Sequence, residues 1–388
     1  MKESKIEIQA GAQNSSFFNV KDFGAKGDGS TPDTAAIQKA LDAAGKVQGT
    51  VYFPSGNYMC RDLKMRSYTT VLGEPQWSTR YEALRNGPVF ILDSPSANCI
   101  FDLTGTYGCH IQGIRLGGHW DFWAAKWGQH GIMINNPTFT QQDNCVVLDQ
   151  VNANSFKGHG IYLKRVKRFT IRHSRFVFNR WNGVCFHGRD GMVLDTEFTT
   201  NSHSGFGTEV SGSNILFTHN RNEWNYEYGL KIFGNTNEPA EGWVVTSNMF
   251  DRNYGAGIGA SHVRNSVFTG NVNRRNGSKV DAGDTAIDVE RGVGVVEGIG
   301  ECCEMLIRSC KGLAITGNAT FADWGDNSGQ LPISPDYTYW TQNNAGCLIT
   351  ENVSSSMVAQ ELNKGGNASD FTIVDNLYRQ GRRYENIF

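Results

Sequence analysis

Short runs of alternating apolar and polar residues dominate this chain from about residue 95 onward, and each run ends at an asparagine. The recurring unit reads Val/Ile-x-Ile/Phe-x-x-Asn, then a turn, then Gly-apolar-x-apolar, as in FTIRHSRFVFNRWNGVCF. Alternation over four to six residues is typical of β-strands, because successive side chains point to opposite faces. The unit therefore predicts short strands joined by tight turns, repeated along most of the chain.

The asparagines recur with the period of a stacked repeat. Asn179, Asn201, Asn225 and Asn253 each begin an Asn-x-x-x-Gly phrase, and they lie 22, 24 and 28 residues apart. A buried asparagine amide can bond the backbone of its own turn and of the next coil. With three short strands per coil, this pattern predicts an all-β, single-stranded parallel β-helix, a solenoid. A second asparagine column has the same character and contains Asn220, Asn248, Asn271, Asn318, Asn352 and Asn376.

The N-terminal part carries a helical pattern instead. Asp33 is a favourable N-cap, and Gly45 predicts the end of the helix. A short amphipathic helix here could cover the open end of a stacked sheet, where the last coil would otherwise expose its core and strand edges. We therefore expect residues 17–60 to form an N-terminal capping helix and the first coil. The apolar face of this helix contains Ala36, Ile37, Ala40, Leu41 and Ala44.

The rest of the chain indicates one domain. We see no linker, charge block or low-complexity segment, so we expect a single β-helix domain over residues 1–388, with regular coils over 95–380. Two segments interrupt the repeat, near 117–130 and 321–343. Irregular insertions in a solenoid become loops on one face, often the binding face. Both segments are rich in aromatic residues, which are Trp120, Phe122, Trp123, Trp127, Trp324, Tyr337, Tyr339 and Trp340.

The composition of the chain limits the kinds of partner and environment that can be expected. The 388 residues include 36 basic and 38 acidic side chains, so a basic surface for nucleic acid is not expected. No apolar run approaches the ~18–20 residues of a membrane span. Residues 1–16 lack the apolar centre of a secretory signal, so export by another route or a removed signal is expected. The nine cysteines show no Cys-x-x-Cys pair, which predicts mostly buried thiols and no structural zinc.

The segment FNVKDFGAKGDGSTPDTAAIQKALDAA, followed by GTVYFPSGNY, resembles the N-terminal signature of the pectate-lyase-like superfamily of right-handed parallel β-helix proteins. That superfamily includes polygalacturonases, rhamnogalacturonases, some glucanases and the depolymerases of phage tail spikes. The resemblance implies a right-handed coil, a polysaccharide substrate, and a location outside the cell (secreted) or in a phage virion. It does not specify the chemistry, because one fold hosts several reactions.

The polygalacturonase branch can be compared motif by motif. Its pattern contains Asn-Thr-Asp, Asp-Asp, Gly-His-Gly and Arg-Ile-Lys in successive coils. Here Gly158-His159-Gly160 matches the third element, but the other three are missing, and the later strand reads Leu230-Lys231-Ile232. The paired aspartates of a polygalacturonase are therefore absent, and Gly158-His159-Gly160 can equally be a repeat turn.

A polar row is expected on the outer surface of the strands that follow the repeat glycines. If Ile161, Leu163, Val184, Phe186, Phe206, Thr208, Leu230 and Ile232 face inward, their neighbours face outward. Coils are ~4.8 Å apart, so Lys164, His187, Glu209 and Lys231 should form a row spanning roughly 15 Å. The turn before each strand adds a border that contains His159, His203, Glu223 and Glu227.

This row suits acid–base chemistry on a sugar chain, as a hydrolase or a lyase. In a hydrolase, Glu209 and Glu227 or Glu223 would flank the glycosidic bond. In a lyase, Lys231 or Lys164 would neutralise a uronic carboxylate, and His187 or Tyr162 would take the C5 proton. The alternative is a solvated ladder of compensating charges. We expect catalytic roles for Glu209, His187, Lys231, Glu227 and Glu223. We expect substrate contacts from Lys164, His159, Tyr162, His203, Trp120, Trp123, Trp127 and Phe233.

No metal or other cofactor is required by this chemistry. An acidic cluster could bind Ca²⁺ through oxygen ligands, but its spacing matches no known calcium loop, and a solvated loop is the simpler interpretation. The cluster contains Asp281, Asp284, Asp288 and Glu290. Three functions stay open: a polysaccharide-cleaving enzyme, a phage tail-spike-type receptor-binding protein or capsule depolymerase, and a non-catalytic carbohydrate-binding solenoid. The protein is expected to be a monomer or a homotrimer with a polysaccharide as its partner.

Overall fold

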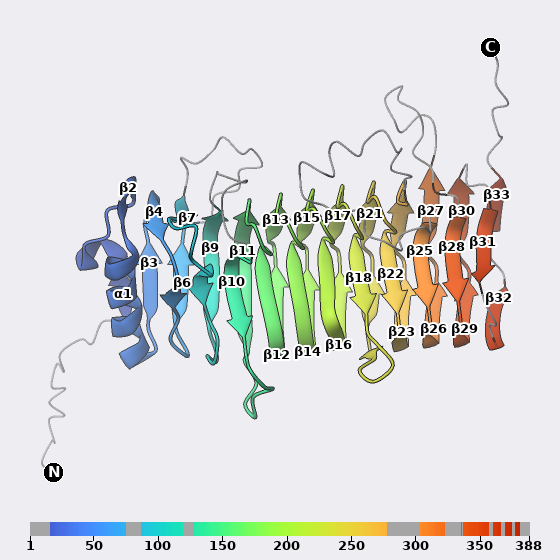
Figure 1. Ribbon diagram of the computed structural model, residues 1–388, viewed down its shortest axis with the longest axis horizontal. Coiled ribbons are helices and arrows are strands. Elements are labelled where there is room, and N and C mark those ends of the chain that lie inside the picture. Colours follow the sequence, from blue (N-terminus) through green and yellow to red (C-terminus); the bar gives the residue numbers. More distant parts are fainter. Residues whose placement is uncertain are drawn as a thin grey trace, which may run out of the picture.

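The computed structural model describes residues 16–74, 87–118, 128–277, 303–322, 335, 337–356, 360–365, 369–374 and 377–380. Within these ranges the chain is an all-β solenoid with a single α-helix at its N-terminal end (Figure 1). Every strand pairing is parallel, and each strand pairs with the equivalent strand one coil away. These pairings stack the strands into three walls, numbered here 1 to 3, that enclose a common interior. The predicted parallel β-helix is therefore confirmed.

Wall 1 holds the strands that follow the repeat glycines. It consists of β5 (Leu63–Lys64), β8 (Cys99–Asp102), β10 (His130–Asn135), the first parts of β12 (Ile161–Arg172), β14 (Val184–Leu194) and β16 (Phe206–Thr218), β18 (Leu230–Phe233), β22 (Ile258–Ser261), β25 (Cys303–Arg308), β28 (Tyr337–Gln342) and β31 (Gln360–Gly365).

Wall 2 continues from wall 1 after a bend. It consists of β1 (Phe17–Asn19), β3 (Thr50–Phe53), β6 (Thr70–Gly73), β9 (His110–Gly117), β11 (Val146–Asn154), the later parts of β12, β14 and β16, β19 (Ala240–Glu241), β20 (Val244–Thr246), β23 (Val263–Thr269), β26 (Lys311–Thr316), β29 (Ala345–Thr350) and β32 (Ser369–Val374).

Wall 3 closes each coil. It consists of β2 (Asp28–Pro32), β4 (Gly56–Cys60), β7 (Pro88–Leu92), the later parts of β9 and β11, β13 (Arg175–Val177), β15 (Glu197–Thr199), β17 (Arg221–Glu223), β21 (Met249–Asp251), β24 (Val272–Arg274), β27 (Ala319–Ala322), β30 (Val353–Ser356) and β33 (Leu377–Gln380).

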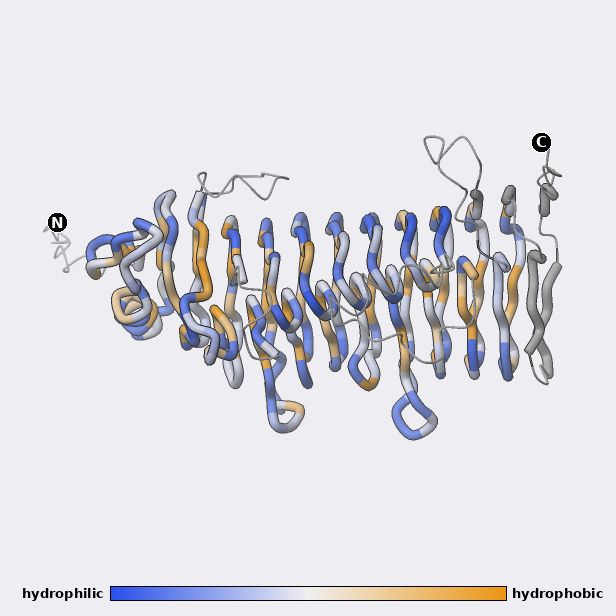
Figure 2. Tube along the Cα trace, turned by 45° about the horizontal axis from the view of Figure 1, so that its top comes forward, coloured by the Kyte–Doolittle hydropathy of each residue, from blue (hydrophilic) through white to orange (hydrophobic). Residues whose placement is uncertain are grey.

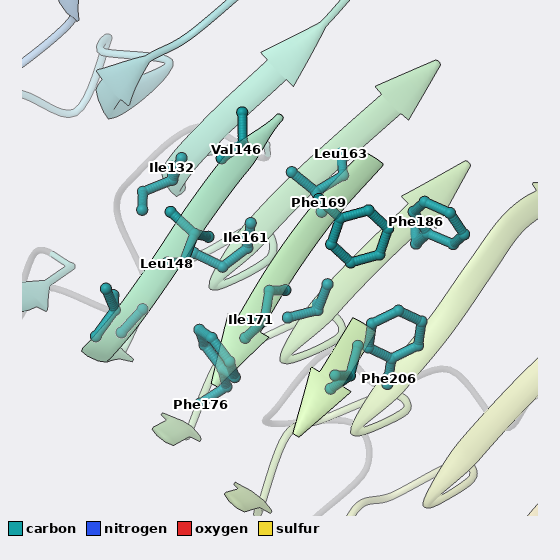
Figure 3. Packing of buried hydrophobic residues seen from close by; sticks show 14 of the residues in the cluster. Ile132, Val146, Leu148, Ile161, Leu163, Phe169, Ile171, Phe176, Phe186 and Phe206 are labelled. Carbon is teal, nitrogen blue, oxygen red and sulfur yellow. The ribbon is translucent and has the colours of Figure 1, made fainter. Parts of the chain in front are cut away.

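The interior is filled by the side chains that alternation predicts to face inward. Ile161, Val184, Phe206 and Leu230 stack in register along wall 1 and are fully buried. Figure 3 shows Leu163, Phe186 and Phe206 pointing into the same space as residues of wall 2. Burying one such side chain stabilises the fold by about 1.5–3 kcal/mol, so a continuous stack supports a long solenoid.

Both asparagine columns form hydrogen-bonded ladders inside the turns. Asn201 illustrates the pattern: its Oδ1 accepts from the backbone N–H and the Nδ2 of Asn179, and its Nδ2 donates to the carbonyl of Phe176 and to Oδ1 of Asn225. Each asparagine thus satisfies backbone groups that stacked turns would bury unpaired. The second column repeats this arrangement from Asn220 to Asn352, and Asn376 lies outside the described residues. Hydrophilic residues mark most of these turns in Figure 2.

Helix α1 (Thr34–Val47) follows the short 3₁₀ segment η1 (Val20–Phe23) and buries Ile37, Ala40, Leu41 and Ala44 against the first coils. Asp33 is the N-cap residue, as predicted, whereas the predicted end at Gly45 was wrong because the helix continues to Val47. The Asp33 side chain makes no cap hydrogen bond, because its carboxylate accepts from the backbone of Lys26 and Gly27. Gly45 lies inside the last turn, where a Cβ would be 2.6 Å from Cβ of Arg66, so close packing requires the glycine.

The irregular segments are only partly described. Residues 119–127 lie outside the described residues, and Trp120, Trp123 and Trp127 fall there. The insertion expected at 321–343 is shorter, because Tyr337–Gln342 form the regular strand β28 between β25 and β31. The eight cysteines that the structure describes are free thiols, and all except Cys145 are buried. Among the described residues, no helix has the length and apolar character needed to span a membrane.

Candidate functional site

The outer face of wall 1 brings the residues of the predicted polar row onto one surface, but only part of the row is in register. Lys164 pairs with His187 across β12 and β14, and Gly207 pairs with Lys231 across β16 and β18. Between His187 and the next coil the register breaks, because β16 carries extra residues after Thr208. Glu209 follows Thr208 at this irregularity, and its carboxylate is paired with the Lys164 ammonium. Lys164 and His187 therefore share one outward column, whereas Lys231 lies in the neighbouring column, with Tyr162, Cys185 and Gly207. The prediction that Lys164, His187, Glu209 and Lys231 form a single row was wrong for Lys231, because the alternation was counted one pair of residues out of register in that coil.

Tyr162, Lys164 and Glu209 form one cluster in this row. The phenol oxygen of Tyr162 lies 3.2 and 3.1 Å from the two carboxylate oxygens of Glu209, and the Lys164 ammonium lies 3.6 Å from Oε1. Burial raises the pKa of Tyr162, and the Glu209 charge raises it further. The phenol is therefore held in its protonated form, as a hydrogen-bond donor. Cys185 pairs with Tyr162 in the next coil and is itself buried beneath these groups.

A ladder of side chains precedes the repeat glycines. The backbone N–H of His159 donates to Nδ1 of His130, and the N–H of Asn182 donates to Nδ1 of His159. Because Nδ1 is an acceptor in both rings, each neutral imidazole carries its proton on Nε2. Burial lowers the pKa of His130 to about 4 and lowers that of His159 well below its usual value. Both histidines are thus neutral donors, and their rings stack with the Tyr162 ring at 5.0 and 5.6 Å.

His203 belongs to the neighbouring position of the same turn. Its ring stacks on Trp181 with centroids 5.0 Å apart, and its Nδ1 lies 3.9 Å from Oε2 of Glu227. The Glu227 carboxylate also accepts from Ser204 Oγ at 2.7 Å and from the Lys231 ammonium at 2.5 Å. Burial lowers the pKa of His203, the Glu227 charge opposes this, and Lys231 adds to it. His203 is therefore a neutral imidazole with Nδ1 facing a carboxylate, which leaves Nε2 as the basic nitrogen.

Two loops project beyond the end of wall 1 (Figure 1), and a residue of each contacts His187. Its Nε2 is 3.2 Å from Oε1 of Glu238, which belongs to the loop after β18. Phe139, from the loop after β10, meets the His187 ring edge-on at 5.6 Å, and Arg189 lies 4.7 Å over the Phe139 ring. The His187 residue is only 5% exposed. The expectation that it faces the solvent was wrong, because the two loops cover it.

Glu223 does not belong to the turn border where the sequence placed it. Strand β17 runs through Glu223, opposite Asp251 of β21, and the turn begins only at Trp224. Its carboxylate accepts from Arg221 on the same strand. It is therefore a residue of wall 3, bonded within that wall, and the border of wall 1 contains His159, His203 and Glu227.

Several members of the site were missed by sequence reasoning. His130 precedes Gly131 as His159 precedes Gly160, and Trp181 occupies the place of His203 one coil earlier, so the repeat itself held a signal for both. Phe139 and Glu238 lie in loops without any repeat, and no pattern indicated them. No group of three or more metal-ligating side chains exists among the described residues. The acidic cluster from Asp281 to Glu290 and the three tryptophans of the first insertion lie outside those residues.

Residues 17–297 match the family described as rhamnogalacturonase A/epimerase, pectate lyase-like. Among curated proteins, mannuronan C5-epimerase AlgE3 of Azotobacter vinelandii is 29% identical over 254 residues, which are 62% of this chain and 12% of that protein. Alginate lyase 7 of the same organism is 71% identical over 42 residues, 11% of this chain and 5% of that protein. The chain thus spans only a small part of the length of these relatives.

Solved structures show the same fold. The A-module of mannuronan C-5 epimerase AlgE4 of Azotobacter vinelandii superposes with a TM-score of 0.60 at 17% identity, over 92% of this chain and 100% of that chain. Tailspike protein 2 of an Escherichia coli O157:H7 bacteriophage superposes with a TM-score of 0.65 at 13% identity, over 88% of this chain and 43% of that chain. These proteins are carbohydrate-acting parallel β-helices. With the family match covering most of its length, this chain belongs to the rhamnogalacturonase A/epimerase, pectate lyase-like family.

Proposed function

We propose that this protein acts on a polyuronate and abstracts the C5 proton of a uronate residue bound on the outer face of wall 1. The observation that carries the proposal is the pairing of a basic nitrogen and a protonated phenol on that face. His203 and Tyr162 come from coils on either side of β14, roughly 10 Å apart at the backbone. The names of two relatives, a mannuronan C5-epimerase and an alginate lyase, agree with a uronate substrate.

A uronate needs its carboxylate neutralised before C5 can lose a proton. Lys164 and Lys231 lie on the two sides of Cys185, and both ammonium groups influence the Cys185 thiol. The Nε2–H groups of His130 and His159 add neutral donors beside Tyr162. Donors and cations that face the same anion stabilise the enediolate formed when C5 is deprotonated. These residues would therefore hold the carboxylate end of the sugar.

The base and the acid follow from the protonation states of the two side chains. Nε2 of His203 would take the C5 proton, and the electron pair of the C–H bond would move into the carboxylate. The Tyr162 hydroxyl would then give its proton to C5 from the opposite face, which inverts that carbon. The phenolate that results would face the Lys164 ammonium. Such an exchange is epimerisation, and it needs one group on each side of the ring.

Elimination is the second candidate, and the short match to alginate lyase 7 favours it. The same C5 deprotonation would be followed by protonation of the leaving oxygen by Tyr162, with cleavage of the chain. Hydrolysis has less support. A hydrolase needs one protonated carboxylic acid. Glu209 and Glu227 are each paired with a lysine ammonium and accept a hydrogen bond from a hydroxyl group, contacts suited to a charged carboxylate.

Proton exchange in deuterated water tests the proposal. The protein would be incubated with polymannuronate, polyguluronate and polygalacturonate, and the products followed by NMR. Deuterium at C5 without new chain ends indicates epimerisation, unsaturated chain ends indicate elimination, and new reducing ends alone indicate hydrolysis. His203→Gln should abolish exchange, whereas His219→Gln, in a turn between walls 2 and 3 of the same coil, should not. Absence of both C5 deuterium and unsaturated chain ends with every polyuronate would refute the proposal.

We also propose that residues 1–388 form one right-handed β-helix domain that α1 closes at its N-terminal end. Contacts between α1 and β1, β3 and β5 support this role, and Figure 1 shows the helix beyond the first coil. A polysaccharide substrate fits a protein that works outside the cell or on a phage particle.

A further inference from the structure

A second apolar cluster lies on the outer face of wall 1, beyond the candidate site. The outward column that contains Lys231 continues through Gly259, Leu306 and Trp340 in β22, β25 and β28. This cluster is separate from the interior core, and its floor is buried even though it lies outside the solenoid. It consists of Tyr228, Ala256, Cys303 and Leu306, with Phe233, Tyr337 and Trp340 partly exposed against them.

Gly259 makes room for the aromatic rings of this cluster. A Cβ at this position would lie 2.7 Å from Cδ1 of Tyr228 and 3.2 Å from Cε1 of Phe233. The two rings therefore lie directly over the strand, with their centroids 5.3 Å apart. Partly exposed rings supported by a packed floor form a rigid surface, and such a surface can contact the apolar face of a sugar ring with little loss of side-chain entropy.

Two cations lie over the Phe233 ring. The Lys231 ammonium is 5.1 Å from the ring centroid, and the Arg308 guanidinium carbon is 5.8 Å from it. Lys231 is already paired with Glu227, whereas Arg308 forms no ion pair within the part of the chain that the structure describes. A guanidinium held over an aromatic ring without a carboxylate partner is suited to bind a carboxylate through two parallel hydrogen bonds.

We propose that Phe233, Arg308 and Trp340 form a second uronate-binding subsite. The inference rests on the proposed function and extends it, because it sets the direction in which the polyuronate lies. Arg308 would bind the carboxylate of one sugar, and Phe233 and Trp340 would contact the rings of that sugar and its neighbour. From the coil of Glu209 to that of Arg308 there are three coil steps, roughly 14 Å. A chain that reaches both sites must therefore lie along the solenoid axis, toward its C-terminal end.

Chain-length dependence tests the subsite. Oligomers of about two or three sugars can occupy the candidate site without reaching Arg308, whereas chains of about eight sugars span both. Arg308→Gln and Trp340→Leu should each raise KM for the long chains about tenfold and leave kcat, and all constants for the short oligomers, unchanged. Lys311→Gln on wall 2 and Trp224→Leu after wall 3 are the matched controls. Equal effects on long and short substrates, or no effect on either, would overturn the subsite.

A binding measurement separates this inference from the proposed function. Retention in gels that contain polygalacturonate, polymannuronate or a neutral glucan would be compared for the wild type and Arg308→Gln, with thermal unfolding to confirm that both are folded. The variant should lose about tenfold in affinity for a polyuronate and nothing for the neutral polymer. If no polyuronate is turned over but this loss is seen, the proposed reaction fails and the subsite stands. If the variant is retained like the wild type, the subsite fails.

Discussion

The Tyr162 hydroxyl and the Glu209 carboxylate are hydrogen-bonded across two coils, although 47 positions separate them in the sequence. Tyr162 leans past Cys185, the residue paired with it in the next coil, and Glu209 is turned back toward it by the irregularity in β16. The carboxylate opposes ionisation of the phenol, so the hydroxyl keeps its proton until a substrate takes it. This contact, rather than either residue alone, defines the acid of the proposed reaction.

Tyr162→Phe should lower kcat by about 10²–10⁴, the usual contribution of a positioned proton donor, with little change in KM. The ring keeps its contacts with the rings of His130 and His159, so folding should not be affected. Steady-state kinetics on the preferred polyuronate is the measurement. Tyr68→Phe is the matched control, because the Tyr68 hydroxyl also has a hydrogen-bond partner, Gln142, but lies away from the site. A Tyr162→Phe variant with wild-type kcat would exclude the phenol as the proton donor.

Lys231→Met should shift the pH profile of kcat/KM. The proposed base, His203, works only when neutral, so activity falls as the pH drops through its pKa. In the wild type, burial and Lys231 lower the pKa of His203. The fall of kcat/KM at acid pH, the acid limb of the profile, should therefore lie below the ordinary histidine pKa near 6.5. Without the ammonium, Glu227 acts unopposed and the limb should move to higher pH. Lys164→Met is the comparison: it should weaken turnover but leave the limb in place. An unmoved limb in Lys231→Met would argue against His203.

The buried histidine ladder should make the protein sensitive to acid. Unfolded His130 binds a proton near pH 6.5, whereas burial lowers the pKa of the folded residue to about 4. Between these values the unfolded state holds more protons, so stability falls as the pH is lowered, by about 3 kcal/mol in total for this group. His130→Gln keeps a side-chain acceptor and removes the titration. Denaturant unfolding at pH 7 and pH 4 should show a smaller loss for the variant, and an equal loss would contradict the assignment.

Sequence periodicity predicts the parts of this protein that are repeated. Alternation identifies Ile161, Val184 and Phe206 as core residues, and the Asn-x-x-x-Gly phrase locates the ladder that contains Asn201. Register follows from the repeat, because equivalent positions in successive coils must pair, and so Lys164 and His187 are side by side. These features depend only on local pattern and on the regular spacing of the coils.

Contacts made by irregular segments could not be predicted from sequence periodicity. The covering of His187 depends on Phe139 and Glu238, which come from two loops of unrelated length and sequence. Glu223 was misplaced because the end of a strand and the start of a turn differ by a single residue in a repeat this short. The tautomers of His130 and His159, which make them donors and not bases, became visible only from the backbone N–H groups that face their rings.

Glu304 takes the place of the next asparagine in the ladder that starts at Asn179 and runs to Asn276. It stands immediately before Met305, at the place where the preceding coil has Gly257 before Ile258. Its side chain enters the interior, and Oε2 accepts from Nδ2 of Asn276 at 2.6 Å, as the next asparagine of the ladder would. The residue is fully buried, and burial raises its pKa to about 8 in spite of the Asn276 hydrogen bond.

This carboxyl group should weaken the fold at alkaline pH. The unfolded residue ionises near pH 4.5, while the folded one stays protonated to about pH 8, so stability declines as the pH rises between these values. The full effect is about 5 kcal/mol from the size of the shift. Glu304→Gln retains an acceptor for Asn276 but cannot ionise. In denaturant unfolding at pH 5 and pH 9, the free energy of unfolding of the variant should rise relative to that of the wild type as the pH rises. Glu241→Gln, on the exposed surface of wall 2, should show no such gain. If the difference between the variant and the wild type is the same at both pH values, Glu304 does not titrate inside the folded solenoid.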